Sequence, residues 1–264
     1  MVTISNITKV IGSTTLFSKA SFQIYDGEKI GLVGPNGAGK TTIFRIIAGE
    51  ELPDSGAVSI QGNIRIAYFS QNVGEMKGQS ALAEVMCGNK PVADLALRLK
   101  SYEDALCNPQ LPPEEMETIL EKLGDDQNRF EKLGGFEIET SAQVILSGLG
   151  IASSDQGKPV EDFSSGWKMR IALAKVLINA PDLVLMDEPT NYLDLETIMW
   201  LEGWLNNFKG AILMTTHDRD FMNRVVRKIV EIAGGAVTTY SGNYDFYEQE
   251  KSIRRKQNES QFNR

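Results

Sequence analysis

One short segment, residues 34–41, constrains the fold of this chain more than any other feature. It reads Gly-Pro-Asn-Gly-Ala-Gly-Lys-Thr and fits the pattern G-x-x-x-x-G-K-[ST]. An apolar run at residues 30–33 precedes it and a helical pattern at residues 41–48 follows it, so we expect a strand, a tight loop and a helix. Glycines let the backbone curl until successive N–H groups point at one anion, and the helix N-terminus adds partial positive charge. The segment predicts a phosphate-binding loop.

This loop and the start of its helix supply the predicted nucleotide contacts. The Lys40 ammonium group would reach the β- and γ-phosphates, and the Thr41 hydroxyl would bind Mg²⁺. The predicted contacts are Gly34, Pro35, Asn36, Gly37, Ala38, Gly39, Lys40, Thr41 and Thr42.

A pair of acidic residues follows a second apolar run of the chain. Residues 183–186 are all apolar and predict a buried strand, and Asp187 and Glu188 stand at its carboxyl end. We expect Asp187 to hold Mg²⁺ through water. We expect Glu188 to polarise the attacking water, with a pKa set by burial and by the nearby metal ion. Together with the phosphate-binding loop, this pair predicts a site of nucleotide hydrolysis.

The only histidine of the chain, His217, follows a third predicted strand at residues 211–215. A single histidine more often has a structural role than a functional one. Ligands of open α/β sheets, however, bind at the carboxyl ends of parallel strands, which is where this histidine is expected. We therefore expect His217 to contact the γ-phosphate.

Two further segments are weak signals when each is taken alone. Gln71 follows a predicted strand at residues 64–69. The signature segment, Ser164-Ser165-Gly166, opens a predicted helix at residues 168–178, and its serines could simply cap that helix. The expected apolar face of the helix consists of Met169, Ala172, Leu173 and Val176.

Strands and helices alternate along most of the chain. Residues 1–33 show short apolar–polar alternations that predict strands, and from residue 183 a strand, a helix and a strand follow one another. Residues 80–150 differ because they have few β-branched residues and many Leu, Glu, Lys and Ala, which predicts helices. The order predicts an α/β fold: a parallel sheet with helices on both faces, interrupted by a helical insert.

Composition excludes several classes of protein. The chain has 264 residues, and no apolar run approaches the roughly 18 residues of a membrane span. Its first ten residues lack the basic-then-apolar order of a signal peptide. The two cysteines, Cys87 and Cys107, are far apart and form no C-x-x-C pair, so a disulfide scaffold or a zinc ribbon is not expected. We expect a cytoplasmic protein without membrane insertion.

The net charge of −8 argues against nucleic-acid binding over the whole surface, but it does not exclude a local basic patch. Residues 251–264 contain one acidic residue, Glu259, and carry a net charge of +4. Such a segment is either a solvated helix face or a site for RNA. Its basic residues are Lys251, Arg254, Arg255, Lys256 and Arg264.

The order of these motifs resembles that of the nucleotide-binding domain of the ABC ATPase superfamily, and the resemblance covers essentially the whole chain. Three features resemble the ABC-F group in particular. Residues 188–194 read Glu-Pro-Thr-Asn-Tyr-Leu-Asp, Trp167 ends the signature where transporters usually have Gln, and residues 240–247 lead into a basic helix. The alternative is the cytoplasmic ATPase subunit of an ABC membrane transporter. The matching motifs are the phosphate-binding loop, Gln71, the signature segment, Asp187-Glu188, Asn191 to Asp194, and His217.

The resemblance implies a P-loop NTPase fold with an ABC-type ATP-binding core, an antiparallel β subdomain and an inserted α-helical subdomain at about residues 72–180. The ABC domain would span residues 1–247, and residues 248–264 would begin a basic helical linker. The implied cofactors are ATP and Mg²⁺. Two such domains would bind ATP head to tail, and the implied partners are a second ABC domain and the ribosome with its RNA.

The resemblance also implies a role for each matching residue. Glu188 would be the catalytic base, assisted by His217 and Gln71. The signature segment, Ser164, Ser165 and Gly166, would contact the ATP of the opposite domain, and Asp194 would couple the two sites. The implied metal ligands are Thr41, Gln71 and Asp187.

Three positions depart from the pattern of the family. Ser165 replaces the usual glycine of the signature, and Phe163 replaces the usual leucine. Ile11 stands where many relatives have an aromatic side chain that stacks on adenine. We expect either weak binding of the base or another ring, Phe17, in that role.

Overall fold

The computed structural model describes residues 1–70, 74, 76–179 and 181–262, and of residues 255–262 it describes the backbone. The predicted metal and γ-phosphate contact Gln71 lies outside the described residues. The chain divides into two compact units. Unit 1 comprises Met1–Asn72 and Ala180–Arg264, and unit 2 comprises Val73–Asn179.

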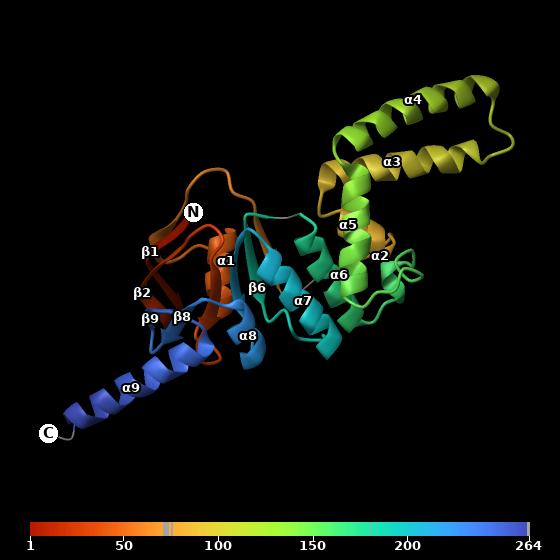
Figure 1. Cartoon of the computed structure of the whole chain (residues 1–264). Coiled ribbons are helices and arrows are strands. Elements are labelled where there is room, and N and C mark those ends of the chain that lie inside the picture. Colours follow the sequence, from red (N-terminus) through yellow and green to blue (C-terminus); the bar gives the residue numbers. More distant parts are fainter. Residues whose placement is uncertain (71–73, 75, 180, 263–264) are drawn as a thin grey trace. The chain divides into compact units, whose positions relative to one another are not determined.

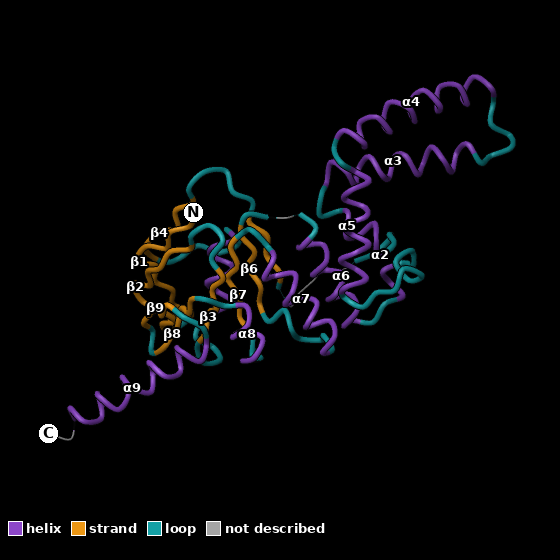
Figure 2. The backbone as a smooth tube through the Cα atoms, in the orientation of Figure 1, coloured by secondary structure: helices purple, strands orange, loops and turns teal. Residues whose placement is uncertain are grey.

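Unit 1 contains two sheets (Figure 2). The smaller sheet is antiparallel, with the order β2-β1-β4. The larger sheet has the order β5-β6-β7-β3-β8-β9 and is parallel except for its last strand. The bounds are β1 (Val2–Ile11), β2 (Thr14–Ile24), β3 (Lys29–Val33), β4 (Ser55–Ile60), β5 (Ile66–Phe69), β6 (Leu183–Asp187), β7 (Ala211–Thr215), β8 (Lys228–Ala233) and β9 (Ala236–Ser241).

Helices cover both faces of the larger sheet, as predicted. Gly31 of β3 faces α8, because a Cβ at this position would lie 3.0 Å from the sulfur of Met222. Its neighbours Ile30 and Leu32 point the other way and share the main hydrophobic core with Phe44 of α1. The helices of unit 1 are α1 (Lys40–Ala48), α7 (Leu195–Asn207), α8 (Arg219–Val225) and α9 (Tyr244–Phe262).

Unit 2 is helical, in agreement with the composition of residues 80–150. Figure 1 shows α3 and α4 as an antiparallel hairpin. The hairpin is fastened by Arg98, whose guanidinium donates two hydrogen bonds of 2.8 and 3.1 Å to the buried carboxylate of Asp126. The bounds are α2 (Ala81–Met86), α3 (Lys90–Leu106), α4 (Pro113–Lys132), α5 (Gly135–Gly148), a 3₁₀ turn (Val160–Asp162) and α6 (Ser165–Leu177).

The apolar face predicted for residues 168–178 is only part of the buried surface of this helix. Residues 169–174 of α6 are all buried, while the predicted core residue Val176 is only half-buried. The helix packs against both α2 and α5. Because two neighbouring helices cover it, α6 has no single buried stripe of the kind that periodicity predicts.

The last helix, α9, is anchored to the sheet by a buried carboxylate. Glu231 of β8 accepts hydrogen bonds from Lys251 Nζ at 2.6 Å, Tyr247 Oη at 2.7 Å and Tyr240 Oη at 3.2 Å. Burial raises the pKa of Glu231, but the hydrogen bonds from Lys251 and Tyr247 outweigh burial, so the pKa is lowered overall. Lys251, which we counted in the basic segment, is therefore an ion-pair partner of the core. Arg254 of the same segment lies 4.9 Å from the centre of the Tyr240 ring.

Replacing Lys251 by Met should destabilise the chain by about 1–2 kcal/mol at pH 7, because Glu231 would remain buried without its cation. A lowered folded-state pKa stabilises the protein above the unfolded value, so this contribution is lost as the pH falls through the folded pKa of Glu231. Urea denaturation should therefore show a difference in stability between the variant and the wild type at pH 7, and this difference should shrink in acid, below the ordinary pKa of a glutamate side chain. Lys209→Met, at an exposed lysine, serves as the control. An equal loss of stability at pH 7 and in acid would contradict the role of the ion pair.

Candidate nucleotide site

The phosphate-binding loop joins β3 to α1 and needs glycine at two positions for different reasons. Gly39 has a φ of +95°, and a Cβ there would lie 2.9 Å from the ring of Phe17 and 3.1 Å from Leu16 Cβ. Gly34 approaches the carbonyl oxygen of Ile232, which would lie 2.5 Å from an added Cβ. The loop is therefore packed between β8 on one side and the β1–β2 hairpin on the other.

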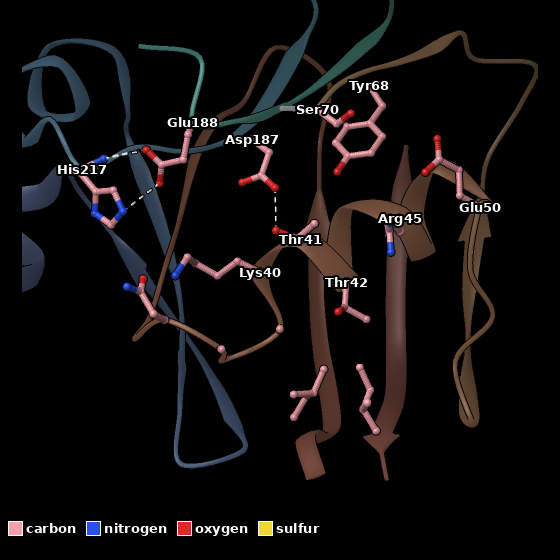
Figure 3. A pocket seen from close by; sticks show the side chains of 15 residues that line it. Lys40, Thr41, Thr42, Arg45, Glu50, Tyr68, Ser70, Asp187, Glu188 and His217 are labelled. Atoms are coloured by element: carbon pink, nitrogen blue, oxygen red, sulfur yellow. Dashed lines mark hydrogen bonds and ion pairs between the residues drawn. The ribbon is translucent and has the colours of Figure 1, made fainter. Parts of the chain in front are cut away.

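The Lys40 side chain folds back over this loop. Its Nζ donates hydrogen bonds to the carbonyl oxygens of Gly34 at 2.8 Å and Pro35 at 3.1 Å. Figure 3 shows its ammonium end on the side of the cavity where Glu188 and His217 lie. The cation is thus held at the mouth of the loop, where a phosphate oxygen can replace the carbonyl oxygens as its partner.

The carboxylate of Asp187 lies at the end of β6 and joins two hydroxyl groups. Thr41 Oγ1 donates to Asp187 Oδ2 at 2.6 Å (Figure 3). Thr215 Oγ1 donates to Asp187 Oδ1 at 2.8 Å. These oxygens fit Mg²⁺, a hard cation that proteins hold through one or two carboxylates together with phosphate and water. In the described part of the chain, no three His, Cys, Asp or Glu side chains form a group that could hold a metal ion.

Glu188 is turned into the cavity by an unusual backbone conformation. Its φ is +54°, a region that costs a non-glycine residue about 1–3 kcal/mol. Its N–H is held by Thr215, which accepts through its carbonyl oxygen at 3.2 Å and through Oγ1 at 3.0 Å. Burial raises the pKa of Glu188, and the proximity of His217 partly offsets this effect. A carboxyl with a raised pKa is a better proton acceptor than an ordinary glutamate.

His217 lies directly beside Glu188. Its backbone N–H donates to Glu188 Oε2 at 3.1 Å, and its Nε2 lies 3.5 Å from Oε1. The imidazole borders the cavity. Because its side chain is 75% exposed, it can reach a ligand there. The structure thus brings together the phosphate-binding loop, Asp187, Glu188 and His217.

These groups line one cavity of about 750 Å³. Ile11 and Leu16 of the β1–β2 hairpin also line it, whereas the predicted stacking ring, Phe17, does not. Phe17 is fully buried beneath Gly39, so its ring has no face for a base. The prediction for Phe17 is wrong, because the apolar–polar alternation of β2 turns this ring into the core.

Tyr68 of β5 is a residue of this cavity that the sequence did not single out. Its ring packs on Phe44 with centroids 5.9 Å apart, and its hydroxyl oxygen is buried without a hydrogen-bond partner among the described residues. Burial and the nearby carboxylate of Asp187 raise the pKa of Tyr68 to about 12, so the hydroxyl stays protonated. In the sequence, the only sign that Tyr68 lines the cavity is its position near the end of a predicted strand, shortly before Gln71.

The signature segment belongs to unit 2. Ser164 stands at the N-cap position of α6, but its side chain makes no capping hydrogen bond, and Ser164 and Ser165 are exposed. Gly166 follows in the first turn. Asp194 caps α7, because its Oδ1 accepts from Thr197 N at 2.9 Å and from Thr197 Oγ1 at 2.8 Å. The capping role of Asp194 was not predicted.

Comparison with known proteins identifies the kind of domain. Residues 17–191 match the family described as "ABC transporter". The chain belongs to this family. The predicted class, an ABC-type ATPase domain with a P-loop NTPase fold, is thereby confirmed.

Curated relatives include ABC-F proteins. The chain is 39% identical over 96% of its length to "Uncharacterized ABC transporter ATP-binding protein YfmR" of Bacillus subtilis, of which it covers 39%. It is 38% identical over 93% of its length to "ABC transporter F family member 2" of Arabidopsis thaliana, of which it covers 36%. The chain thus spans less than two fifths of the length of these two relatives.

Solved structures of ABC domains share the fold. An ATP-binding subunit of an ABC transporter aligns with a TM-score of 0.68 at 20% identity, over 96% of this chain and 94% of that one. A dimeric ATP-binding cassette in a post-hydrolysis state with ADP and Pi aligns with a TM-score of 0.63 at 19% identity, over 91% of this chain and 98% of that one. Of the helices in the described part of this ABC domain, none has both the length and the apolar character needed to cross a membrane.

Replacing Tyr68 by Phe should stabilise the nucleotide-free ABC domain by about 1 kcal/mol, because the variant removes a buried hydroxyl that has no partner within the described part of the chain. Tyr247→Phe is the matched control, since it removes a hydroxyl that donates to Glu231 at 2.7 Å and should destabilise by a similar amount. Urea denaturation of the two variants measures both effects. A loss of stability in Tyr68→Phe would show that the hydroxyl is paired.

Proposed function

We propose that this chain is one ATP-hydrolysing domain of a cytoplasmic ABC-F protein that closes on a second ABC domain and acts on the ribosome in translation. The observation that carries the hydrolytic part is the convergence of Lys40, Asp187, Glu188 and His217 on one cavity. The similarity to ABC-F relatives and the basic segment after residue 250 support the ribosomal part.

The chain's own residues divide the chemistry among them. Lys40 would exchange its loop carbonyl partners for phosphate oxygens, and the oxygens of Thr41 and Asp187 would hold the metal ion. Mg²⁺, when bound, neutralises charge on the β- and γ-phosphate oxygens. Glu188 accepts the proton of the attacking water while the oxygen of that water bonds to the γ-phosphorus and the bond to the bridging oxygen breaks. His217 holds Glu188 in place and presents its imidazole to the γ-phosphate.

The signature segment would complete the site of the opposite domain. Ser164 and Ser165 are exposed at the N-terminus of α6, and the Ser164 hydroxyl is not used for capping. A helix N-terminus favours an anion, so this end of α6 suits the γ-phosphate of an ATP held by a second ABC domain. The chain carries one phosphate-binding loop and one signature segment, and two domains arranged head to tail would form two complete sites.

The alternative is an ATPase subunit of a membrane transporter. The sequence Glu-Pro-Thr-Asn-Tyr-Leu-Asp at residues 188–194 and the helix α9, which leaves the domain after Tyr244, favour the ABC-F assignment. The reading frame beyond residue 264 distinguishes the two. A charged helical pair followed by a second phosphate-binding loop supports ABC-F.

Replacing Glu188 by Gln should lower the rate of ATP hydrolysis by about 10²–10⁴-fold, because the amide keeps the size of the side chain but cannot accept a proton. ATP affinity should be retained, whereas Lys40→Ala, the comparison variant, should lose affinity instead. Phosphate release and calorimetric titration of the full-length protein measure the two quantities. Unchanged turnover in Glu188→Gln would place the base elsewhere.

The ribosomal role is tested by sedimentation. Full-length Glu188→Gln protein, which binds but does not hydrolyse ATP, should pellet with ribosomes when ATP is present and remain in solution without it. Gly166→Asp should bind ATP but fail to pellet, because its carboxylate would repel the γ-phosphate of the opposite domain and prevent closure. Pelleting that does not depend on ATP would contradict the link between closure and ribosome binding. An absence of pelleting together with binding to membrane vesicles would favour the transporter assignment.

A further inference from the structure

The hydroxyl oxygen of Tyr68 is buried at the wall of the nucleotide cavity. It has no hydrogen-bond partner in the part of the chain that the structure describes. The ring packs on Phe44, and a phenylalanine ring could make the same contact without the cost of a buried, unpaired hydroxyl. A buried polar group without a protein partner, at the wall of a binding cavity, indicates a ligand that supplies the partner.

The hydroxyl faces the part of the cavity where the metal ion is expected. Figure 3 shows it pointing into the cavity on the side of Thr41 and Asp187. The Lys40 side chain extends the opposite way, toward Glu188, and the terminal phosphate is expected between these two groups (Figure 3). After burial, the charge of Asp187 contributes most to the raised pKa of Tyr68, so these two side chains lie close together. The hydroxyl is therefore on the side of the metal ligands rather than of the reacting phosphate.

A metal ion held here would bring water molecules with it. Mg²⁺ prefers six oxygen ligands and gives up its water reluctantly, so it keeps several waters beside its carboxylate and phosphate ligands. The positive charge polarises these waters, which makes them strong hydrogen-bond donors that need acceptors. The Tyr68 hydroxyl stays protonated, because its pKa is raised to about 12, and its oxygen keeps lone pairs that can accept such a bond.

We infer that the Tyr68 hydroxyl oxygen accepts a hydrogen bond from a water molecule of the Mg²⁺ shell and thereby helps to hold the metal ion beside Asp187. Tyr68 acts on the reaction through this water and does not touch the reacting atoms, so it is a positioning residue. Its hydroxyl gains a partner when the metal-bound nucleotide enters the cavity. The inference rests on the proposed site of ATP hydrolysis, which it deepens, and is independent of the ribosomal role.

The test compares nucleotide binding with and without the metal ion. The chain is titrated calorimetrically with the non-hydrolysable ATP analogue AMP-PNP, once with excess Mg²⁺ and once with EDTA. Tyr68→Phe should weaken binding about tenfold with Mg²⁺, because the hydrogen bond from the metal-bound water is lost. In EDTA no metal-bound water is present to pair with the hydroxyl, so the affinities of the wild type and the variant should agree within about twofold.

Urea denaturation gives a second measurement that does not depend on turnover. A ligand stabilises the folded chain by an amount that grows with its affinity. With Mg²⁺, a saturating concentration of AMP-PNP should raise the free energy of unfolding of the wild type more than that of Tyr68→Phe. With EDTA, it should raise both by the same amount. The comparison separates a contact to the metal shell from the effect of the substitution on the nucleotide-free domain.

Two further variants control for the loss of a hydroxyl and for the change in the cavity wall. Tyr25→Phe removes a phenolic hydroxyl at a position that is 53% exposed and outside the cavity lining, so it should leave both affinities unchanged. Tyr68→Met lacks the hydroxyl but keeps a large apolar side chain, and it should show the same loss of affinity that depends on Mg²⁺.

Equal weakening of Tyr68→Phe with Mg²⁺ and with EDTA would overturn the inference, because the hydroxyl would then contact the nucleotide itself. Unchanged binding of the variant under both conditions would overturn it as well, while the proposed site of hydrolysis would stand. If the wild-type chain does not bind the analogue under either condition, the nucleotide site is overturned together with the inference.

Discussion

The nucleotide site depends on the hydrogen bonds that the carboxylate of Asp187 accepts. It lies at the end of β6, between the Thr41 hydroxyl of α1 at 2.6 Å and the Thr215 hydroxyl of β7 at 2.8 Å. Strands β6, β7 and β3 are neighbours in the sheet, so their carboxyl ends meet at one edge. A buried carboxylate needs donors, and the two threonines supply them. Thr41 also fastens the start of α1 to the end of β6 in this way.

Thr215 also positions Glu188, the residue that follows Asp187. Thr215 accepts a bifurcated hydrogen bond from the N–H of Glu188, through its carbonyl oxygen and its hydroxyl oxygen. These bonds offset part of the cost of the positive φ at Glu188, and that φ turns the side chain from the strand toward His217. The position of the Glu188 carboxylate is thus set by β7, although the residue follows β6.

Much of this site could be predicted from the sequence because it depends on local patterns. The glycine spacing of the phosphate-binding loop and the acidic pair after an apolar strand place Lys40, Thr41, Asp187 and Glu188 at the sheet edge without any knowledge of packing. The position of Phe17 could not be predicted in this way, since it depends on which face of β2 meets the core. Tyr68 was missed for a similar reason, because a tyrosine in a short strand looks like an ordinary half-buried residue.

The anchor of α9 shows that a lysine of a basic segment can stabilise the core instead of contacting a partner. In the register of β3 and β8, Glu231 pairs with Val33, the residue before Gly34, and the next residue, Ile232, is the one whose carbonyl oxygen limits Gly34 to glycine. The strand that confines the phosphate-binding loop therefore also holds Lys251 through Glu231. An isolated lysine on a helix would gain little from a surface contact, but this one neutralises a buried carboxylate. The point where the chain leaves the ATPase core is thus fixed to the strand pair that carries the loop.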